Sequence, residues 1–239
     1  MRRKKLAAAA AGRFELFGGG YQSNMKNTST RGNSDVVDML DTVTNSWSVA
    51  HLSQPRQYIT ATSLGAKAIF AGGFCSPCKG QPGTSRSVVA DIFDSTKGTW
   101  SSHKLSQRRS NLAITNVAGR YAFIGGGTTD VSPGAALISR SDVVDVYDSK
   151  LDSWSVIKMS AGRCCLGAAG GNRSAVFCGG TAANPCDVFT LKTDDSIGAR
   201  AATAHASAAS TSASFHISKD AVGCLWRFQD HASAGDHRW

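Results

Sequence analysis

Short runs of apolar residues that end in Asp, Asn, Ser or Gly recur along the chain. The clearest run spans residues 141–154 and reads SDVVDVYDSKLDSW, with Val143, Val144 and Tyr147 in its first half. β-Branched and aromatic residues favour strands, and Asp and Ser side chains favour turns because they bond local backbone amides. The segment therefore predicts a strand, a turn and the start of a second strand at Trp154.

This segment is part of a repeat. It occurs twice earlier, as SDVVDMLDTVTNSW at 34–47 and as SVVADIFDSTKGTW at 87–100. Three kinds of marker share a spacing of 53 or 54 residues, namely the glycine pairs Gly18-Gly19, Gly72-Gly73, Gly125-Gly126 and Gly179-Gly180; the tryptophans Trp47, Trp100 and Trp154; and the arginines Arg56, Arg109 and Arg163. A shared register of this kind predicts a fold built from copies of one structural unit.

Each unit is expected to hold four strands. An apolar strand follows the arginine, as in LAITNV after Arg109, and a second strand runs into the glycine pair, as in YAFIGGG. The Val-rich third strand follows a loop of variable length, and the fourth strand carries the tryptophan. Glycine permits a positive φ and close backbone approach, and tryptophan covers a large apolar area, so these markers are predicted to be packing residues.

This unit of roughly fifty residues resembles the kelch repeat, whose family forms β-propellers. The resemblance covers about residues 6–191 and implies an all-β fold, a kelch-type β-propeller with three full four-stranded blades plus most of a fourth. The expected units are about 6–55, 56–108, 109–162 and 163–192, all within a domain at 1–192. Residues 193–239 lack the repeat, with Ala201 and Ala202 near the expected tryptophan, and predict an Ala/Ser-rich irregular or disordered tail.

The N-terminus superficially resembles a signal peptide, with a basic start and a run of small residues. The repeat gives a better interpretation, because AGRFELFGGG at 11–20 aligns without gaps to AGRYAFIGGG at 118–127. The alanines at 7–11 are then expected to form a degenerate first strand.

Closed propellers typically have roughly four to eight blades, so three and three-quarter units are marginal for closure. Three interpretations stay open. The sequence is a fragment of a longer propeller, or the tail supplies the missing strand, or two chains self-associate through open propeller ends.

Composition bounds the setting. The 239 residues carry a formal charge of +9 and seven cysteines, an odd number that excludes a complete set of internal disulfides. We expect a reducing, cytoplasmic location on that basis. No apolar run approaches the roughly 18 residues of a membrane span, so no membrane partner is expected.

Charge is expected to gather on one face. In a four-strand meander, the loops between second and third strands and those between units emerge at the same end. We predict that a protein partner, an acidic one, binds there through steering and charge-assisted bonds. The candidate partner-binding residues are Lys26, Arg31, Arg56, Lys79, Arg86, Arg109, Arg140 and Arg163. An alternative for Arg56, Arg109 and Arg163 is that they brace neighbouring loops within the fold.

Other chemistry is less supported. The loops offer only Tyr21 and Phe74 for base stacking, so no nucleic acid is expected. Cys75 and Cys78 form a C-x-x-C without a second pair at zinc spacing, and we expect neither a metal nor a redox role. Cys164, Cys165, Cys178 and Cys186 are interpreted as small buried apolar groups.

The sequence therefore predicts a non-catalytic protein-interaction module, with no catalytic residues, no cofactor and no metal site. Some kelch-type propellers are enzymes, so the alternatives are a carbohydrate-active or copper-dependent oxidase-like kelch enzyme, or a fragment of a larger kelch protein. Four of the six histidines fall in the tail, which disfavours a copper site within the repeats.

Overall fold

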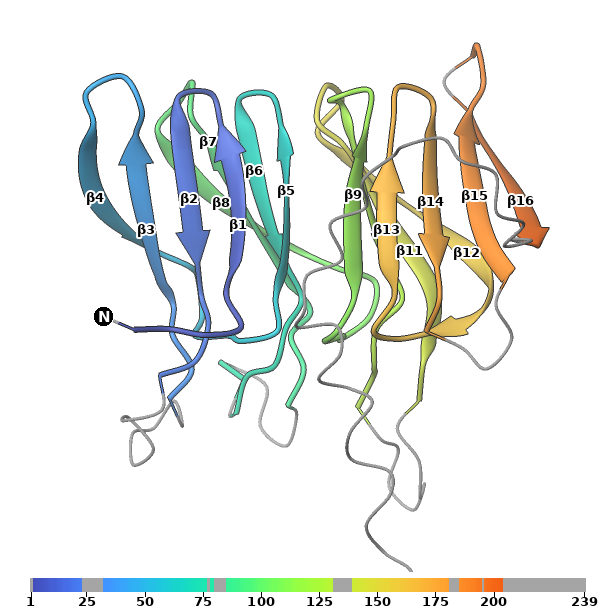
Figure 1. The fold of residues 1–239 in the computed structure, drawn as a ribbon, viewed down its shortest axis with the longest axis horizontal. Coiled ribbons are helices and arrows are strands. Elements are labelled where there is room, and N and C mark those ends of the chain that lie inside the picture. The colour runs from blue at the N-terminus through green and yellow to red at the C-terminus, as the bar shows by residue number, and fades with distance from the viewer. Residues whose placement is uncertain are drawn as a thin grey trace, which may run out of the picture. The chain divides into compact units, whose positions relative to one another are not determined.

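The structure, a computed structural model, describes residues 2–22, 32–76, 78–79, 85–130, 139–180, 185–194 and 196–203. All of them belong to one compact unit, Met1–Ala204. Within these ranges the protein is all-β, without a helix, and its strands form four four-stranded antiparallel sheets. Each sheet is a meander whose strands lie in chain order (Figure 1). We call the sheets blades 1 to 4.

The strand boundaries follow the predicted units. Blade 1 holds β1 (Ala7–Ala11), β2 (Phe14–Gly18), β3 (Val36–Asp41) and β4 (Ser46–His51). Blade 2 holds β5 (Thr60–Leu64), β6 (Lys67–Ala71), β7 (Val89–Asp94) and β8 (Thr99–Lys104). Blade 3 holds β9 (Ala113–Val117), β10 (Tyr121–Gly125), β11 (Ser141–Asp148) and β12 (Ser153–Arg163). Blade 4 holds β13 (Gly167–Gly170), β14 (Ser174–Cys178), β15 (Pro185–Leu191) and β16 (Ile197–Thr203).

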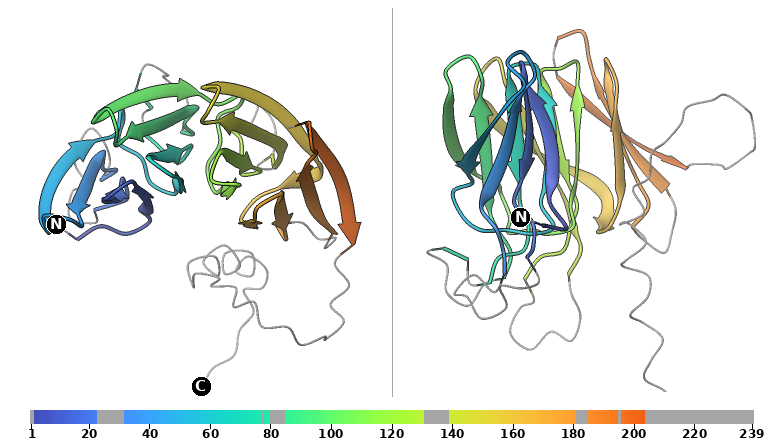
Figure 2. Two further views of the ribbon diagram at one scale, coloured as in Figure 1. Left: turned by 90° about the horizontal axis from the view of Figure 1, so that it is seen from above. Right: turned by 60° about the vertical axis from the view of Figure 1, so that its left-hand side comes forward.

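Consecutive blades pack against each other within this unit. The first strands of neighbouring blades lie side by side, β1 with β5, β5 with β9 and β9 with β13, and the blades follow one another along an arc (Figure 2). Each of the three interfaces has its own apolar cluster, represented by Leu16 and Phe70, by Ile69 and Ile124, and by Phe123 and Phe177. All six side chains are fully buried, and each such burial stabilises the fold by about 1.5–3 kcal/mol.

The glycines explain how closely the blades approach. A Cβ at Gly18 would lie 2.8 Å from the Phe70 ring of the next blade, and one at Gly125 would lie 2.7 Å from the Phe177 ring. The two positions are therefore strand residues covered by an aromatic ring, and not the first members of the turn pairs. The pairs with positive φ are Gly19-Gly20, Gly72-Gly73, Gly126-Gly127 and Gly179-Gly180. The predicted register was thus wrong by one residue in the first and third units, where three glycines stand in a row.

A buried arginine joins each of blades 2, 3 and 4 to the blade before it. The Nη1 atom of Arg109 donates to the carbonyls of Gly126 (3.0 Å) and Val143 (2.7 Å), and Nη2 donates to the Asp145 carboxylate. The backbone carbonyl of Arg109 accepts a 2.9 Å bond from the amide of Gly73 in blade 2. One residue thus binds two strands of its own blade and the glycine pair of the preceding blade. We call this arrangement the arginine latch.

The ion pair of the latch occurs in all four blades, and the bond to the preceding blade occurs in blades 2, 3 and 4. The ion pairs are Arg3 with Asp38, Arg56 with Asp91, Arg109 with Asp145 and Arg163 with Asp187. The carbonyls of Arg56 and Arg163 accept amide bonds of 2.7 Å from Gly20 and Gly127. Apart from the arginine and the aspartate, the latch uses backbone carbonyls and no further side chain of the described residues.

The fourth blade corrects the sequence prediction. Its fourth strand, β16, exists and pairs with β15 from Leu191↔Ile197 to Pro185↔Thr203, beyond the predicted boundary at residue 192. A strand at the outer edge of a blade is held by backbone hydrogen bonds and needs little apolar patterning, which is why its Ala-rich sequence gave no signal. The rest of the predicted tail, 204–239, lies outside the described residues. The sequence predicted three full blades plus most of a fourth, whereas the structure has four four-stranded sheets.

The N-terminal alanines form the expected degenerate first strand. β1 pairs with β2 along its whole length, from Ala7↔Gly18 to Ala11↔Phe14. The prediction from the alignment is thus confirmed.

Four cysteines form two disulfides, Cys75–Cys78 in the loop after β6 and Cys178–Cys186 between β14 and β15. The sequence had indicated that Cys178 and Cys186 are small apolar groups. That interpretation was wrong, because the two residues are joined in a disulfide. The two residues stand on adjacent strands, a place where two thiols can join without moving the backbone.

Candidate functional site

The candidate site is the end of the blades where the second strands finish and the first strands begin, which we call the loop face. Isolated bridges connect three chain segments at this end of each of the first three blades. They join Lys4, Tyr21 and Asn33 in blade 1, Gln57, Phe74 and Arg86 in blade 2, and Ser110, Thr128 and Arg140 in blade 3. The predicted grouping of these loops at one end is therefore correct, and Figure 1 shows them opposite the tight turns.

Three of the predicted partner-binding residues are not available on this surface. Arg56, Arg109 and Arg163 have no exposed area, and each is paired with a buried aspartate. Burial lowers the pKa values of Arg56 and Arg109, and the facing aspartates oppose that shift. Their assignment to the binding surface was wrong, because their charge is neutralised inside the latch. The bracing role considered as the alternative agrees with this geometry.

Arg86 lies at the boundary between blades 2 and 3. Its Nη1 atom is 3.0 Å from Oδ1 of Asp130, and its Nε donates to Oγ1 of Thr128 at 3.1 Å. Asp130 Oδ1 also accepts from the amide and hydroxyl of Ser85. Most of the charge of Arg86 is therefore used in holding two loops together, and its side chain is only 13% exposed.

Arg140 is exposed and lies beside a pair of adjacent cysteines. A hydrogen bond with Cys165 and the guanidinium of Arg140 lower the pKa of the Cys164 thiol to about 6, although partial burial opposes this. Both cysteines are half-buried and neither is in a disulfide. Cys164 directly follows the latch arginine Arg163, and the equivalent residue of blade 3 is Ser110. The repeat pattern therefore did not indicate a reactive thiol at this position.

Two lysines that the prediction had left out stand beside two tyrosines on the loop face. Lys5 Nζ lies 4.2 Å from the centre of the Tyr58 ring and 5.8 Å from that of Tyr21, and Lys4 Nζ lies 5.6 Å from the Tyr21 ring. Tyr58 is 40% exposed, and both lysines are exposed. The alignment with the third unit was the signal that could have placed them here, since it sets Lys4 and Lys5 directly after the latch arginine Arg3.

The remaining predicted residues divide simply. Lys79 is exposed on the loop after β6, whereas Lys26 and Arg31 lie outside the described residues. Cys75 and Cys78 are buried and disulfide-bonded. Across the described part of the chain, no three His, Cys, Asp or Glu side chains gather into a metal-binding group, and no helix is long and apolar enough to cross a membrane.

The first blade has an exposed apolar face. Trp47 and Val49 on β4 are each 63% exposed, and Trp47 contacts Phe17 with ring centres 6.2 Å apart. Self-association through the ends of the arc stays a prediction.

These sheets define an all-β protein built from blades, with a propeller-like fold. No protein-family model and no curated protein matches the chain. Among solved structures, the structure of YjhT is similar, with a TM-score of 0.53 and 19% sequence identity. The match covers 74% of this chain and 59% of the YjhT chain, so the present sequence spans less than two thirds of that protein. A likeness at this identity shows the fold alone.

Proposed function

We propose that this chain is a non-catalytic interaction module of kelch type that binds an acidic protein segment through its loop face. The observation that supports this best is the cluster of Lys4, Lys5, Tyr21 and Tyr58, which we call the lysine–tyrosine cluster. Its ammonium groups are exposed, and no ion pair is found for either lysine among the described residues.

The chemistry of the cluster suits carboxylates. Each lysine can donate to an incoming carboxylate while its ammonium group stays beside a tyrosine ring, and this contact limits the side-chain freedom that is lost on binding. Tyrosine adds a flat apolar surface with a polar tip, a combination common at protein interfaces. Lys79 and Arg140 extend the positive charge along the same face over blades 2 and 3.

The kelch type of the blades is part of the proposal. Its support is the recurrence of four features in one order, namely the latch arginine, the glycine pair, the aspartate of the third strand and the tryptophan of the fourth. The first three occur in every blade, and the tryptophan occurs in the first three.

A charge-reversal experiment tests the binding surface. A fluorescein-labelled peptide of twelve glutamates serves as the acidic probe, and its anisotropy reports binding at 50 and 300 mM salt. Lys4→Glu with Lys5→Glu should weaken binding at least tenfold at low salt, because two attractive contacts become repulsive. Binding by the unaltered chain should weaken at the higher salt through screening.

The matched control changes the same charge at the opposite end. Lys97→Glu with Lys150→Glu alters two exposed lysines on the turns between third and fourth strands. It should change the dissociation constant less than twofold. Equal losses in the two double variants would reject the loop face as the binding surface. Equally tight binding of a labelled single-stranded DNA would reject a preference for acidic protein.

A further inference from the structure

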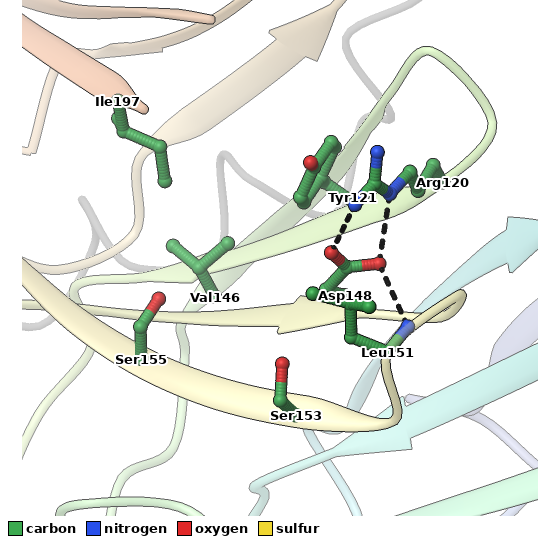
Figure 3. Close-up of a pocket in the computed structure, with 8 residues that line it drawn as sticks. All are labelled: Arg120, Tyr121, Val146, Asp148, Leu151, Ser153, Ser155 and Ile197. Atoms are coloured by element: carbon green, nitrogen blue, oxygen red, sulfur yellow. Dashed lines mark hydrogen bonds and ion pairs between the residues drawn. The ribbon is translucent and has the colours of Figure 1, made fainter. Parts of the chain in front are cut away.

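A cavity of about 240 Å³ lies at the interface of blades 3 and 4 (Figure 3). Its walls come from the turn end of blade 3 and from the first residue of β16, and the lining residues are Arg120, Tyr121, Val146, Asp148, Leu151, Ser153, Ser155 and Ile197. Ser153 and Ser155 stand opposite Asp148 and Val146 in the β11–β12 ladder, so all four share one face of the sheet.

The preceding interface shows what fills the corresponding place there. Between blades 2 and 3, Trp154 of β12 packs on Tyr147, with ring centres 5.0 Å apart, and on His103 of β8 at 5.9 Å. The Tyr147 hydroxyl donates to Asp152 at 2.7 Å and accepts from Lys67 at 3.0 Å. Two aromatic rings and a polar chain therefore occupy the turn end of that interface.

Blade 4 lacks these groups. Phe189 takes the place of Tyr147, and Ala199 stands directly opposite it, where Trp154 stands opposite Tyr147. Ala199 is exposed. The interface that holds the cavity therefore lacks one indole ring and one phenol hydroxyl that the preceding interface has.

The walls combine apolar groups, one arginine–aspartate ion pair and two hydroxyl groups. Tyr121 and Val146 are buried and form the apolar part with Ile197. Arg120 and Asp148 are joined by two bonds, Nε to Oδ1 at 2.9 Å and Nη2 to Oδ2 at 2.6 Å, so their charges cancel at the wall. The Arg120 guanidinium also lies over the Tyr121 ring, 4.6 Å from its centre. Ser153 and Ser155 add hydroxyl groups at the rim.

We propose that this cavity binds a small uncharged aromatic molecule of the size of indole, at the interface where the fourth tryptophan of the repeat is missing. An enclosed apolar cavity of about 150 Å³ takes up a benzene-sized molecule. This pocket is larger, at about 240 Å³, and is open to solvent on one side, so a two-ring compound can enter it. The apolar wall would stack the ring, and a serine hydroxyl would accept a bond from its N–H. A charged compound is disfavoured because the only charges at the wall are already paired with each other.

Indole titration of the full chain tests the proposal. Saturation-transfer NMR with indole should give a binding signal with a dissociation constant in the millimolar range or below. Indole-3-carboxylate should bind at least tenfold more weakly, because its charge finds no unpaired partner. Absence of a signal for indole up to its solubility limit would overturn the proposal.

Two variants locate the site. Ala199→Trp places an indole side chain at the vacant repeat position, and Ser155→Leu fills the cavity from β12. Each should weaken indole binding at least tenfold while the circular-dichroism spectrum is kept. Using two positions separates occupation of the cavity from a folding failure of either variant alone. Unchanged binding in both folded variants would mean that indole binds elsewhere.

The matched control is Val156→Trp. Val156 neighbours Ser155 on β12, but strand alternation directs it to the other face of the sheet, where it is 52% exposed. This variant adds the same side chain to the same strand without entering the cavity. Indole should bind to it as to the unaltered chain, and a loss equal to that of Ala199→Trp would contradict the assignment.

Discussion

Blades 3 and 4 have the same strand order and the same arginine latch, yet they are covered differently. In blade 3, Trp154 packs against Tyr147 and reaches His103 of the preceding blade. In blade 4, Ala199 stands at the equivalent position of the fourth strand, and a disulfide joins the second and third strands of this blade. The comparison shows that the latch is present in both blades although their aromatic residues differ. The aromatic residue of the fourth strand can be lost without loss of the strand.

The largest expected effect on stability comes from removing the latch of blade 3, which would make this blade differ from blade 4 in the feature that they share. Arg109→Met leaves Asp145 buried without its partner and deprives two carbonyls of their donor. Breaking a buried pair on one side costs about 3–5 kcal/mol, and we expect a loss of that size in the free energy of unfolding. Urea denaturation followed by circular dichroism measures it.

A double variant serves as the control for this prediction. Arg109→Met with Asp145→Leu removes both charges and should recover part of the loss, since no uncompensated charge stays buried. A single-variant loss below about 1 kcal/mol would show that the latch is not what holds the blades together.

The next test converts the interface of blades 2 and 3 into one like that of blades 3 and 4. Trp154→Ala removes the indole from a half-buried position and leaves a cavity. We expect a loss of about 2–3 kcal/mol, less than for a fully buried tryptophan. Trp47→Ala is the control, because Trp47 is 63% exposed and should cost clearly less. Equal losses in thermal or urea unfolding would mean that burial at the interface is not the cause.

Much of this architecture could be predicted because the repeat records it in the sequence. Markers such as Trp100 and Trp154 gave the order of strands, and the all-β, blade-built fold follows from that order. The missing fourth tryptophan was also visible in the sequence. From this absence the sequence predicted that the fourth unit lacks its fourth strand. That prediction was wrong, because β16 is held by backbone pairing with β15 without a tryptophan.

The candidate site was harder to predict for a physical reason. Arg109 and Asp145 are 36 residues apart, and charge counting treats them as separate surface groups. The recurrence of arginine and aspartate at a spacing of 35 or 36 residues in each of the first three units was the available signal. The Lys5 stacking on Tyr58 depends on two blades meeting, which composition alone cannot express.

The smallest expected effect concerns reactivity and leaves stability unchanged. Cys164 of blade 4 follows its latch arginine as Ser110 follows Arg109 in blade 3, so the two blades differ here by a thiol. Because the pKa of Cys164 is lowered to about 6, its thiolate is present above that pH and is lost as the pH falls through it. Alkylation by iodoacetamide should therefore rise with a midpoint near pH 6, as measured by mass spectrometry of the peptide. Arg140→Ala should move the midpoint upward because one source of the shift is removed, and a midpoint of 8 or above in the unaltered chain would contradict the assignment.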